Sequence, residues 1–121
     1  MTIKEISSGK LKVRKSKFYG HLYEIETKDD IKEIQKTHNR LYKKANHHCY
    51  GAIYDNTEEQ KADGEVGSPG RVLLELLKNN GLNSHMLIVS RVFGGIKLGP
   101  GGVSRAFRET GRGVIESYKK K

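Results

Sequence analysis

Apolar and polar residues alternate along much of the chain in a pattern that predicts four β-strands. Residues 3–8 form the first strand, before a Ser8-Gly9-Lys10 turn, and residues 18–25 form the second. An aromatic-rich strand follows at 48–54, and the continuous apolar run at 86–89 is typical of a buried strand. In the second strand, one face holds Tyr19, His21, Tyr23 and Ile25, and the other holds Phe18, Gly20 and Leu22.

Apolar residues at helical spacing predict three helices. Thr27, with Asp30 three residues later, begins the first helix with a capping box. Ser68 and Pro69 begin the second as N-cap and first helical residue, and Gly81 ends it. The three buried stripes are Ile31, Ile34, His38 and Leu41; Val72, Leu73, Leu76 and Leu77; and Val103, Phe107, Val114 and Tyr118.

The resulting element order, β-β-α-β-α-β-α, predicts an α+β fold. We expect a single domain over residues 1–121, built as a two-layer α/β sandwich in which a mixed β-sheet carries its helices on one face. Residues 55–68 are polar and contain two glycines. We therefore predict a long functional loop in this segment, placed near the glycine-rich turn described below.

Charge is distributed unevenly over the 121 residues, which carry a formal net charge of +9. Residues 1–48 have a net charge of +6, residues 49–90 of −3 and residues 91–121 of +6. Two basic segments around an acidic one favour a polyanionic partner such as nucleic acid. The alternative is a lysine-rich surface that only keeps the protein in solution.

Cysteine content and hydropathy narrow the class of protein further. A single cysteine, Cys49, excludes an internal disulfide and a cysteine-based zinc site. The N-terminus does not resemble a signal peptide, and no apolar run approaches membrane length. We therefore expect a cytoplasmic protein without membrane contact or cofactor, while the oligomeric state does not follow from the sequence.

The segment between the fourth strand and the third helix is the most informative part of the chain. It holds five glycines within nine residues: Gly94, Gly95, Gly99, Gly101 and Gly102. A glycine-rich turn before a helix presents free backbone N–H groups and the helix dipole to an anion. We predict an anion or nucleic-acid site here, completed by Arg91, Lys97, Arg105, Arg108 and Arg112. The alternative is architectural, because glycines also allow positive φ and close packing.

Two familiar phosphate-binding motifs do not fit this turn. A Walker loop needs Lys and Ser or Thr after its last glycine, whereas Val103 follows Gly102. A dinucleotide fingerprint needs a third glycine at the position of Ser104. The segment is therefore an anion-site candidate without a standard signature.

His47, His48, Asp63 and Glu65 are further candidate ligand-contacting residues. Neighbouring histidines in a strand point to opposite faces, so they do not easily share an ion, and we predict no metal site. The two acidic residues suit either paired carboxylates or a turn in which Glu65 pairs with an arginine such as Arg91 or Arg105; we favour the turn. Cys49 is interpreted as a small buried hydrophobe, and no catalytic residue is predicted.

Four ordered motifs over nearly the full chain resemble the conserved domain of the IMPACT family of YigZ-type proteins. The family's Ser-Lys-Phe matches Ser16-Lys17-Phe18, and its His-His-Cys-x-Ala matches residues 47–52 with one extra residue. Its Asp-Gly-Glu-Pro loop matches Asp63-Gly64-Glu65, with Val66 in place of proline. Its Arg-x-Phe-Gly-Gly-x-x-Leu-Gly-x-Gly-Gly-Leu-x-Arg-Ala matches residues 91–106, with Val103 in place of leucine.

The resemblance implies a fold similar to domain IV of elongation factor G and to the N-terminal domain of GHMP kinases. It also implies a role in translation, because eukaryotic relatives interfere with activation of an initiation-factor kinase. We therefore favour a binding module that contacts RNA, the ribosome or a translation-regulatory protein. Tyr19, Tyr23, Tyr50 and Tyr54 would add stacking surfaces if they face outward.

The alternative is a small phosphoryl-transfer or nucleotide-processing enzyme that uses the glycine-rich turn as a phosphate loop. It follows from the similarity of residues 99–104 to the phosphate loop of GHMP kinases. The chain lacks the second half that such kinases need, and no catalytic base is evident in the sequence. A binding module is the simpler interpretation.

Overall fold

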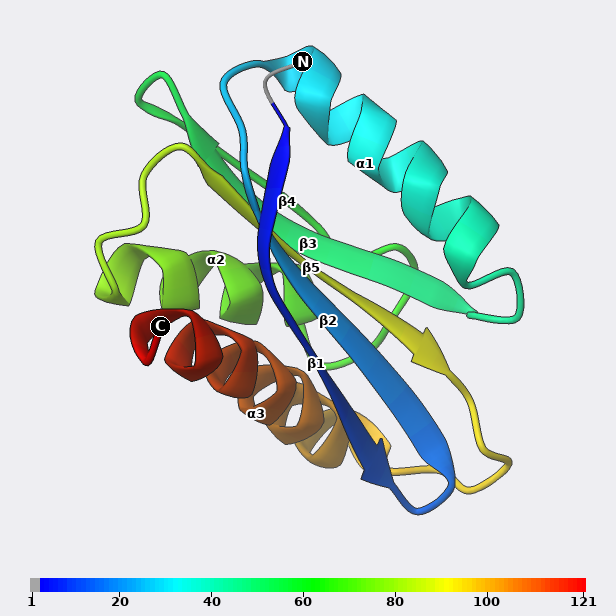
Figure 1. Ribbon diagram of the computed structural model, residues 1–121. Helices are drawn as coiled ribbons and strands as arrows, with labels where there is room; N and C mark the ends of the chain where they lie inside the picture. Colours follow the sequence, from blue (N-terminus) through cyan, green and yellow to red (C-terminus); the bar gives the residue numbers. More distant parts are fainter. Residues whose placement is uncertain (1–2) are drawn as a thin grey trace.

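Five antiparallel strands form one sheet, and three helices pack against it in a computed structural model that describes residues 3–121 (Figure 1). The spatial order of the strands is β1-β2-β5-β3-β4. The strands are β1 (Lys4–Val13), β2 (Ser16–Glu24), β3 (His47–Tyr54), β4 (Thr57–Lys61) and β5 (His85–Val92). The helices are α1 (Lys28–Leu41), α2 (Pro69–Asn79) and α3 (Gly99–Lys119). The α+β class is confirmed, and within residues 3–121 no helix is long and apolar enough to cross a membrane.

The sheet is fully antiparallel, so the prediction of a mixed sheet was wrong. The cause is β4, which lies within the segment predicted to be only a loop. Its sequence, Thr-Glu-Glu-Gln-Lys, has no apolar residue, and it forms an edge of the sheet. Because β4 reverses the chain once more before α2, β5 returns antiparallel to β3 instead of parallel.

Both faces of the sheet carry helices, so the prediction of helices on one face was also wrong. In Figure 1, α2 and α3 lie on one side of the strands and α1 lies on the other. The α1 side holds a second, smaller core, which consists of Tyr23, Ile25, Ile31, Ile34, Tyr50, Ala52, Met86 and Ile88. The sheet is therefore the middle layer of three.

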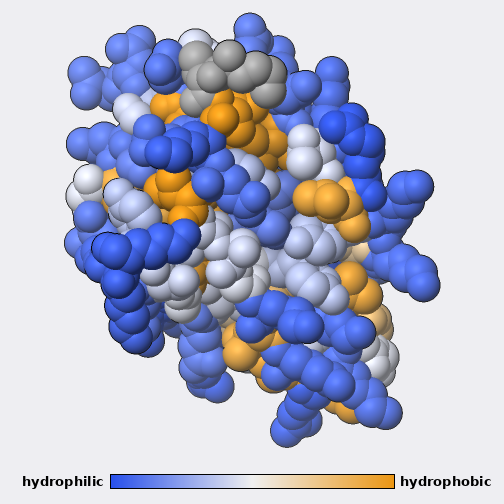
Figure 2. Space-filling model, viewed as in Figure 1, coloured by the Kyte–Doolittle hydropathy of each residue, from blue (hydrophilic) through white to orange (hydrophobic). Residues whose placement is uncertain are grey.

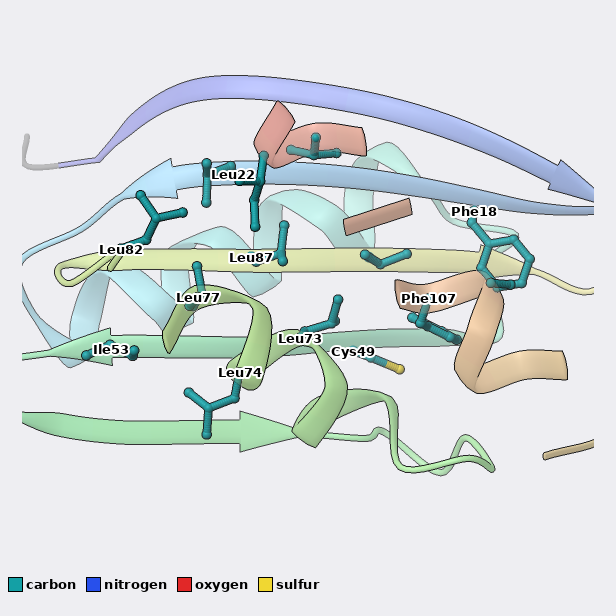
Figure 3. Close-up of a cluster of buried hydrophobic side chains, with 14 of the residues drawn as sticks. Phe18, Leu22, Cys49, Ile53, Leu73, Leu74, Leu77, Leu82, Leu87 and Phe107 are labelled. Atoms are coloured by element: carbon teal, nitrogen blue, oxygen red, sulfur yellow. The ribbon is translucent and has the colours of Figure 1, made fainter. Parts of the chain in front are cut away.

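The larger core lies between the sheet, α2 and α3, and Figure 3 shows its side chains converging from these elements. Phe18 of β2 and Phe107 of α3 meet edge to face, with ring centroids 5.3 Å apart. The central contributors from β3, β5 and α2 are Cys49, Leu73, Leu77, Leu87 and Val89. Removing this apolar surface from water is the main force that holds the two layers together.

Helix boundaries follow the local signals in part. The capping box of α1 is confirmed: the Asp30 carboxylate accepts from the Thr27 N–H at 3.2 Å, and Thr27 accepts from the Asp30 N–H at 3.4 Å. Gly81, with φ +64°, follows the end of α2 as predicted. Ser68 stands at the N-cap position with φ 51°, but its side chain makes no capping hydrogen bond. Leu41 was wrongly placed in the buried stripe, because it is 59% exposed.

Gly51 sets the distance between β3 and α2, because a Cβ there would lie 2.4 Å from the backbone nitrogen of Leu74. We expect Gly51→Ala to lower the free energy of unfolding by about 2 kcal/mol or more, since helix backbone cannot move as a side chain does. Gly113→Ala is the matched control: nothing lies within 4 Å of a Cβ there, on the exposed side of α3. It should stabilise the protein by about 0.5–1 kcal/mol. Urea unfolding measures both, and equal effects would contradict the close-packing argument.

Candidate functional site

Arg91, near the end of β5, is the centre of a buried polar cluster. Its side chain is 6% exposed, and its Nη1 donates to both carboxylate oxygens of Glu65 at 3.0 Å. Its Nη2 donates to the Ser16 hydroxyl at 3.3 Å. The guanidinium carbon lies 5.5 Å from the ring centroids of Phe18 and Phe93. The positive charge is therefore matched by a carboxylate whose side chain is only 4% exposed.

Glu65 belongs to a loop that β3 holds in place through the side chains of His47 and Cys49 and the backbone of His48. His47 Nε2 lies 3.5 Å from the second carboxylate oxygen of Glu65, and His47 Nδ1 lies 2.9 Å from the Asp63 carbonyl oxygen. The Asp63 carboxylate accepts from the His48 backbone N–H at 2.8 Å, and the Cys49 thiol donates to the Ala62 carbonyl. These contacts order residues 62–65, which agrees with the favoured interpretation of the acidic residues as a turn in which Glu65 pairs with an arginine.

This loop also contacts the beginning of α3, in agreement with the prediction that it lies near the glycine-rich turn. A Cβ on Gly67, which has φ +82°, would lie 2.5 Å from the Pro100 carbonyl oxygen and 3.1 Å from the Ser104 nitrogen. On the other side, Gly94 donates its N–H to the Ser16 hydroxyl at 3.2 Å, and a Cβ there would collide with the Lys15 backbone. Two of the glycines in this region are therefore needed for close packing.

The N-terminus of α3 itself opens toward a basic hollow. Leu98 stands at the N-cap position and makes no side-chain hydrogen bond to the helix, and the first turn has no acidic residue. The hollow beside it is lined by Val13, Arg14, Lys97, Leu98, Gly102, Arg105, Ala106 and Glu109. We call it the α3 hollow. Its lining has three cations against one carboxylate, next to the positive end of a helix dipole.

The predicted anion-site residues therefore separate into two groups. Arg91 is buried against Glu65 and does not line the α3 hollow, whereas Lys97, Gly102 and Arg105 do. Arg108 and Arg112 are exposed on α3, as are Gly95, Gly99 and Gly101 in and after the turn. Within residues 3–121, none of the arginines on α3 forms an ion pair.

The face of the sheet beneath α1 carries a chain of hydrogen-bonded histidines that the sequence analysis did not foresee. The Ser90 hydroxyl lies 2.7 Å from His48 Nδ1 and 3.1 Å from His38 Nδ1. The other ring nitrogen of His38 lies 3.0 Å from the Tyr23 hydroxyl. Burial lowers the pKa of His38 to about 3 and also lowers the pKa of His48. Both rings are therefore neutral partners of hydroxyl groups at neutral pH.

Several residues of these clusters were missed or misread, although the sequence held a signal for some. Ser16 was predicted only as part of a family motif, and His38 only as a buried residue of the first helix. A serine inside an apolar strand, Ser90, and a histidine inside an apolar stripe both indicate a buried hydrogen bond. Nothing in the local sequence shows that these two residues face each other, because they are far apart along the chain.

The Cys49 thiol lies in the larger core. Burial raises the pKa of the Cys49 thiol well above its ordinary value, so the reactive thiolate is not populated at neutral pH. Ser90 is fully buried. In the part of the chain that the structure describes, no three His, Cys, Asp or Glu side chains are grouped to hold a metal ion.

Comparison with known proteins gives these features a context. The model of the Impact N-terminal domain matches residues 14–115. IMPACT family member YvyE of Bacillus subtilis is 37% identical over 119 residues, which cover 95% of this chain and 54% of the relative. An IMPACT family member of Haemophilus influenzae is 30% identical over 113 residues, which cover 88% of this chain and 53% of the relative. The chain therefore belongs to the IMPACT family, and it spans about half the length of these curated relatives.

Two solved structures share the fold. One, described as the crystal structure of a hypothetical protein, aligns with a TM-score of 0.86 at 23% identity and covers 96% of this chain and 61% of its own. The other, the two-domain translational regulator Yih1, aligns with a TM-score of 0.56 at 20% identity and covers 94% of this chain and 46% of its own. Both likenesses concern the fold alone.

Replacement of Glu65 tests the cost of the buried ion pair. Glu65→Gln leaves the Arg91 guanidinium buried beside a neutral amide, and we expect a loss of about 3–5 kcal/mol in the free energy of unfolding. Glu75→Gln is the control, because Glu75 pairs with Arg71 on the exposed side of α2. That pair should contribute at most about 0.5 kcal/mol. Chemical denaturation compares them, and a loss below about 1 kcal/mol for Glu65→Gln would show that the pair does not hold the loop.

The neutral state of His38 predicts a pH dependence of stability. The folded state keeps His38 unprotonated down to about pH 3, whereas the unfolded chain binds a proton near pH 6.5. The unfolded state therefore holds more protons between these values, and the free energy of unfolding falls as the pH is lowered. We expect a loss of about 2 kcal/mol between pH 6.5 and 5 from this group.

His38→Gln is the control for this pH dependence. It keeps polar atoms near Tyr23 and Ser90 but removes the titrating group, so the same decrease in pH should cost the variant less stability than the wild type. Thermal or urea unfolding at several pH values gives the two slopes. Parallel slopes would assign the acid sensitivity to other residues.

Proposed function

We propose that this chain is a binding module that regulates translation, and that the α3 hollow takes a phosphate group of RNA or of the ribosome. The translational role is supported by membership of the IMPACT family and by the description of the structural relative Yih1 as a translational regulator. The phosphate site is an inference from the geometry of α3.

The observation that carries the phosphate site is an uncapped helix N-terminus beside converging cations. The first backbone N–H groups of α3 have no side-chain acceptor, and Arg14, Lys97 and Arg105 line the adjacent hollow. An anion placed there would accept hydrogen bonds from the backbone and neutralise the surrounding positive charge. Phosphate combines the required charge with several acceptor oxygens.

The β1–β2 hairpin supplies further support. Arg14 and Lys15 form its two-residue turn, with φ of 45° and 70°. Such turns favour Asn and Gly, because positive φ costs other residues about 1–2 kcal/mol each. Arg14, which lines the α3 hollow, therefore keeps its charge there at the expense of backbone strain.

Enzymatic phosphoryl transfer is not proposed. The glycine-rich turn that would serve as a phosphate loop is present. No side chain among residues 3–121, however, is marked by its contacts as a catalytic base beside that turn. The alternative partner is a translation-regulatory protein. An acidic protein surface would contact the same cations, and the test below distinguishes it from phosphate by its different selectivity.

Arg105→Glu tests the α3 hollow. The probe is labelled inorganic polyphosphate, which carries phosphates without bases, and fluorescence anisotropy is measured over a range of salt concentrations. We expect the affinity to fall by more than about fivefold and the slope of log affinity against log salt to flatten by about one to two units. Arg105 is exposed, so the fold should persist, as circular dichroism would show.

Lys120→Glu is the matched control, because it makes the same change in net charge at an exposed position beyond the end of α3. A smaller loss for this variant would localise binding to the α3 hollow. Equal losses would mean that only overall charge matters and that the glycine-rich turn is architectural. Tight binding of an acidic peptide without binding of polyphosphate would favour a protein partner.

A further inference from the structure

A second basic hollow lies on the α1 side of the sheet, between the C-terminal end of α1 and the neighbouring ends of β2 and β5. It is lined by Lys17, Tyr19, Arg40, Leu41, Tyr42, Lys43, Lys44 and Val92. We call it the tyrosine hollow. In the view of Figure 2, hydrophilic residues predominate on the surface, and apolar areas are confined to small gaps between them.

Two tyrosine rings form a flat platform in this hollow. Tyr19 and Tyr42 stack with their ring centroids 4.6 Å apart and their planes inclined by 16°. The Tyr42 hydroxyl lies 2.6 Å from His21 Nε2, and His21 Nδ1 contacts the Glu5 carboxylate, so the Tyr42 ring is held in orientation. Both tyrosines remain partly exposed. Of the other three tyrosines predicted to add stacking surfaces, Tyr23 and Tyr50 are buried and Tyr54 is partly exposed.

Four cations surround the platform: Lys17, Arg40, Lys43 and Lys44. All four are exposed, and within the described residues none forms an ion pair. Among residues 3–121, no carboxylate lines the hollow, and the Glu5 carboxylate is engaged by His21. The hollow is therefore electrostatically complementary to a flexible polyanion.

We propose that the tyrosine hollow binds single-stranded RNA, with a base stacked on the Tyr19–Tyr42 pair and phosphates on the surrounding cations. Single-strand binding uses aromatic rings among lysines and arginines on which bases stack, and a base can extend the Tyr19–Tyr42 stack because every base has a flat face. A duplex keeps its bases stacked on each other and cannot offer one to the platform. An acidic peptide would match the charge but not the stacked rings.

The β1–β2 hairpin lies between the two hollows and contributes residues to each. Arg14 lines the α3 hollow, and Lys17, three residues further on, lines the tyrosine hollow on the other face of the sheet. A single strand that crosses the Arg14-Lys15 turn would therefore meet both. This inference deepens the proposed function, but it rests on different residues and can fail separately.

The test compares a labelled oligouridylate of about eight nucleotides with an abasic strand of the same length and charge. Stacking predicts that the wild type binds the base-containing strand at least about fivefold more tightly, which corresponds to one stacked base. Tyr19→Leu should abolish this preference while leaving affinity for the abasic strand unchanged. Tyr19→Phe should preserve the preference, because the ring stacks and the hydroxyl does not. Quenching of tyrosine fluorescence, in a chain without tryptophan, reports the contact directly.

Three results would overturn the inference: equal affinity of the wild type for the two strands, an unchanged preference in Tyr19→Leu, or tighter binding of an oligoglutamate of equal charge. Arg105→Glu separates the two proposals, since it should weaken binding of both strands and of polyphosphate without removing the preference for bases. A loss in Arg105→Glu together with no effect of Tyr19→Leu would retain the α3 hollow and reject the tyrosine hollow. Normal Tyr19-dependent stacking with no effect of Arg105→Glu would do the reverse.

Discussion

The buried contact between Arg91 and Glu65 is the interaction on which the rest of this end of the molecule depends. It joins the end of β5 to the loop after β4, and through Ser16 it reaches the beginning of β2. Removing a guanidinium group and a carboxylate from water is costly, and only well-formed mutual contacts offset that cost. The loop is thereby fixed against α3, where Gly67 meets Pro100. Each of the four family motifs contributes a residue to this junction: Ser16, His47, Glu65 and Arg91.

The surface cations differ from Arg91 in their surroundings. Arg91 is neutralised inside the molecule, whereas Arg105 on α3 and Lys97 in the turn have no carboxylate partner among the described residues. Gly94 allows the backbone to pass close to Lys15, and no side chain caps the N-terminus of α3. The architectural role that the sequence offered therefore holds for Gly94, whereas nothing lies within 4 Å of a Cβ at the exposed Gly95, Gly99 and Gly101.

The two faces of the sheet have different chemistry. The α2 and α3 side is a continuous apolar core, closed by Phe18 against Phe107. The α1 side is apolar only at one end. Beyond it lie hydrogen-bonded histidines, with Ser90 between His38 and His48. The cover that α1 gives this face is incomplete: His38 and Ser90 are buried, but Tyr19 and Tyr42 near the C-terminal end of α1 are partly exposed. This incomplete coverage creates the tyrosine hollow.

The sequence by itself determined the three helices, the strands β2, β3 and β5, the capping box at Thr27 and the family. It ended the first strand at a Ser8-Gly9-Lys10 turn, whereas β1 continues to Val13 and turns at Arg14 and Lys15. It could not reveal β4, whose five polar residues become a strand only by pairing with β3, and so it could not determine the direction of β5. It offered Arg91 and Arg105 equally as partners for Glu65. Tertiary structure chose Arg91, because β3 pairs His47 with Arg91 and the loop that carries Glu65 lies against His47. Local patterns encode elements, whereas pairing partners are decided by how these elements pack.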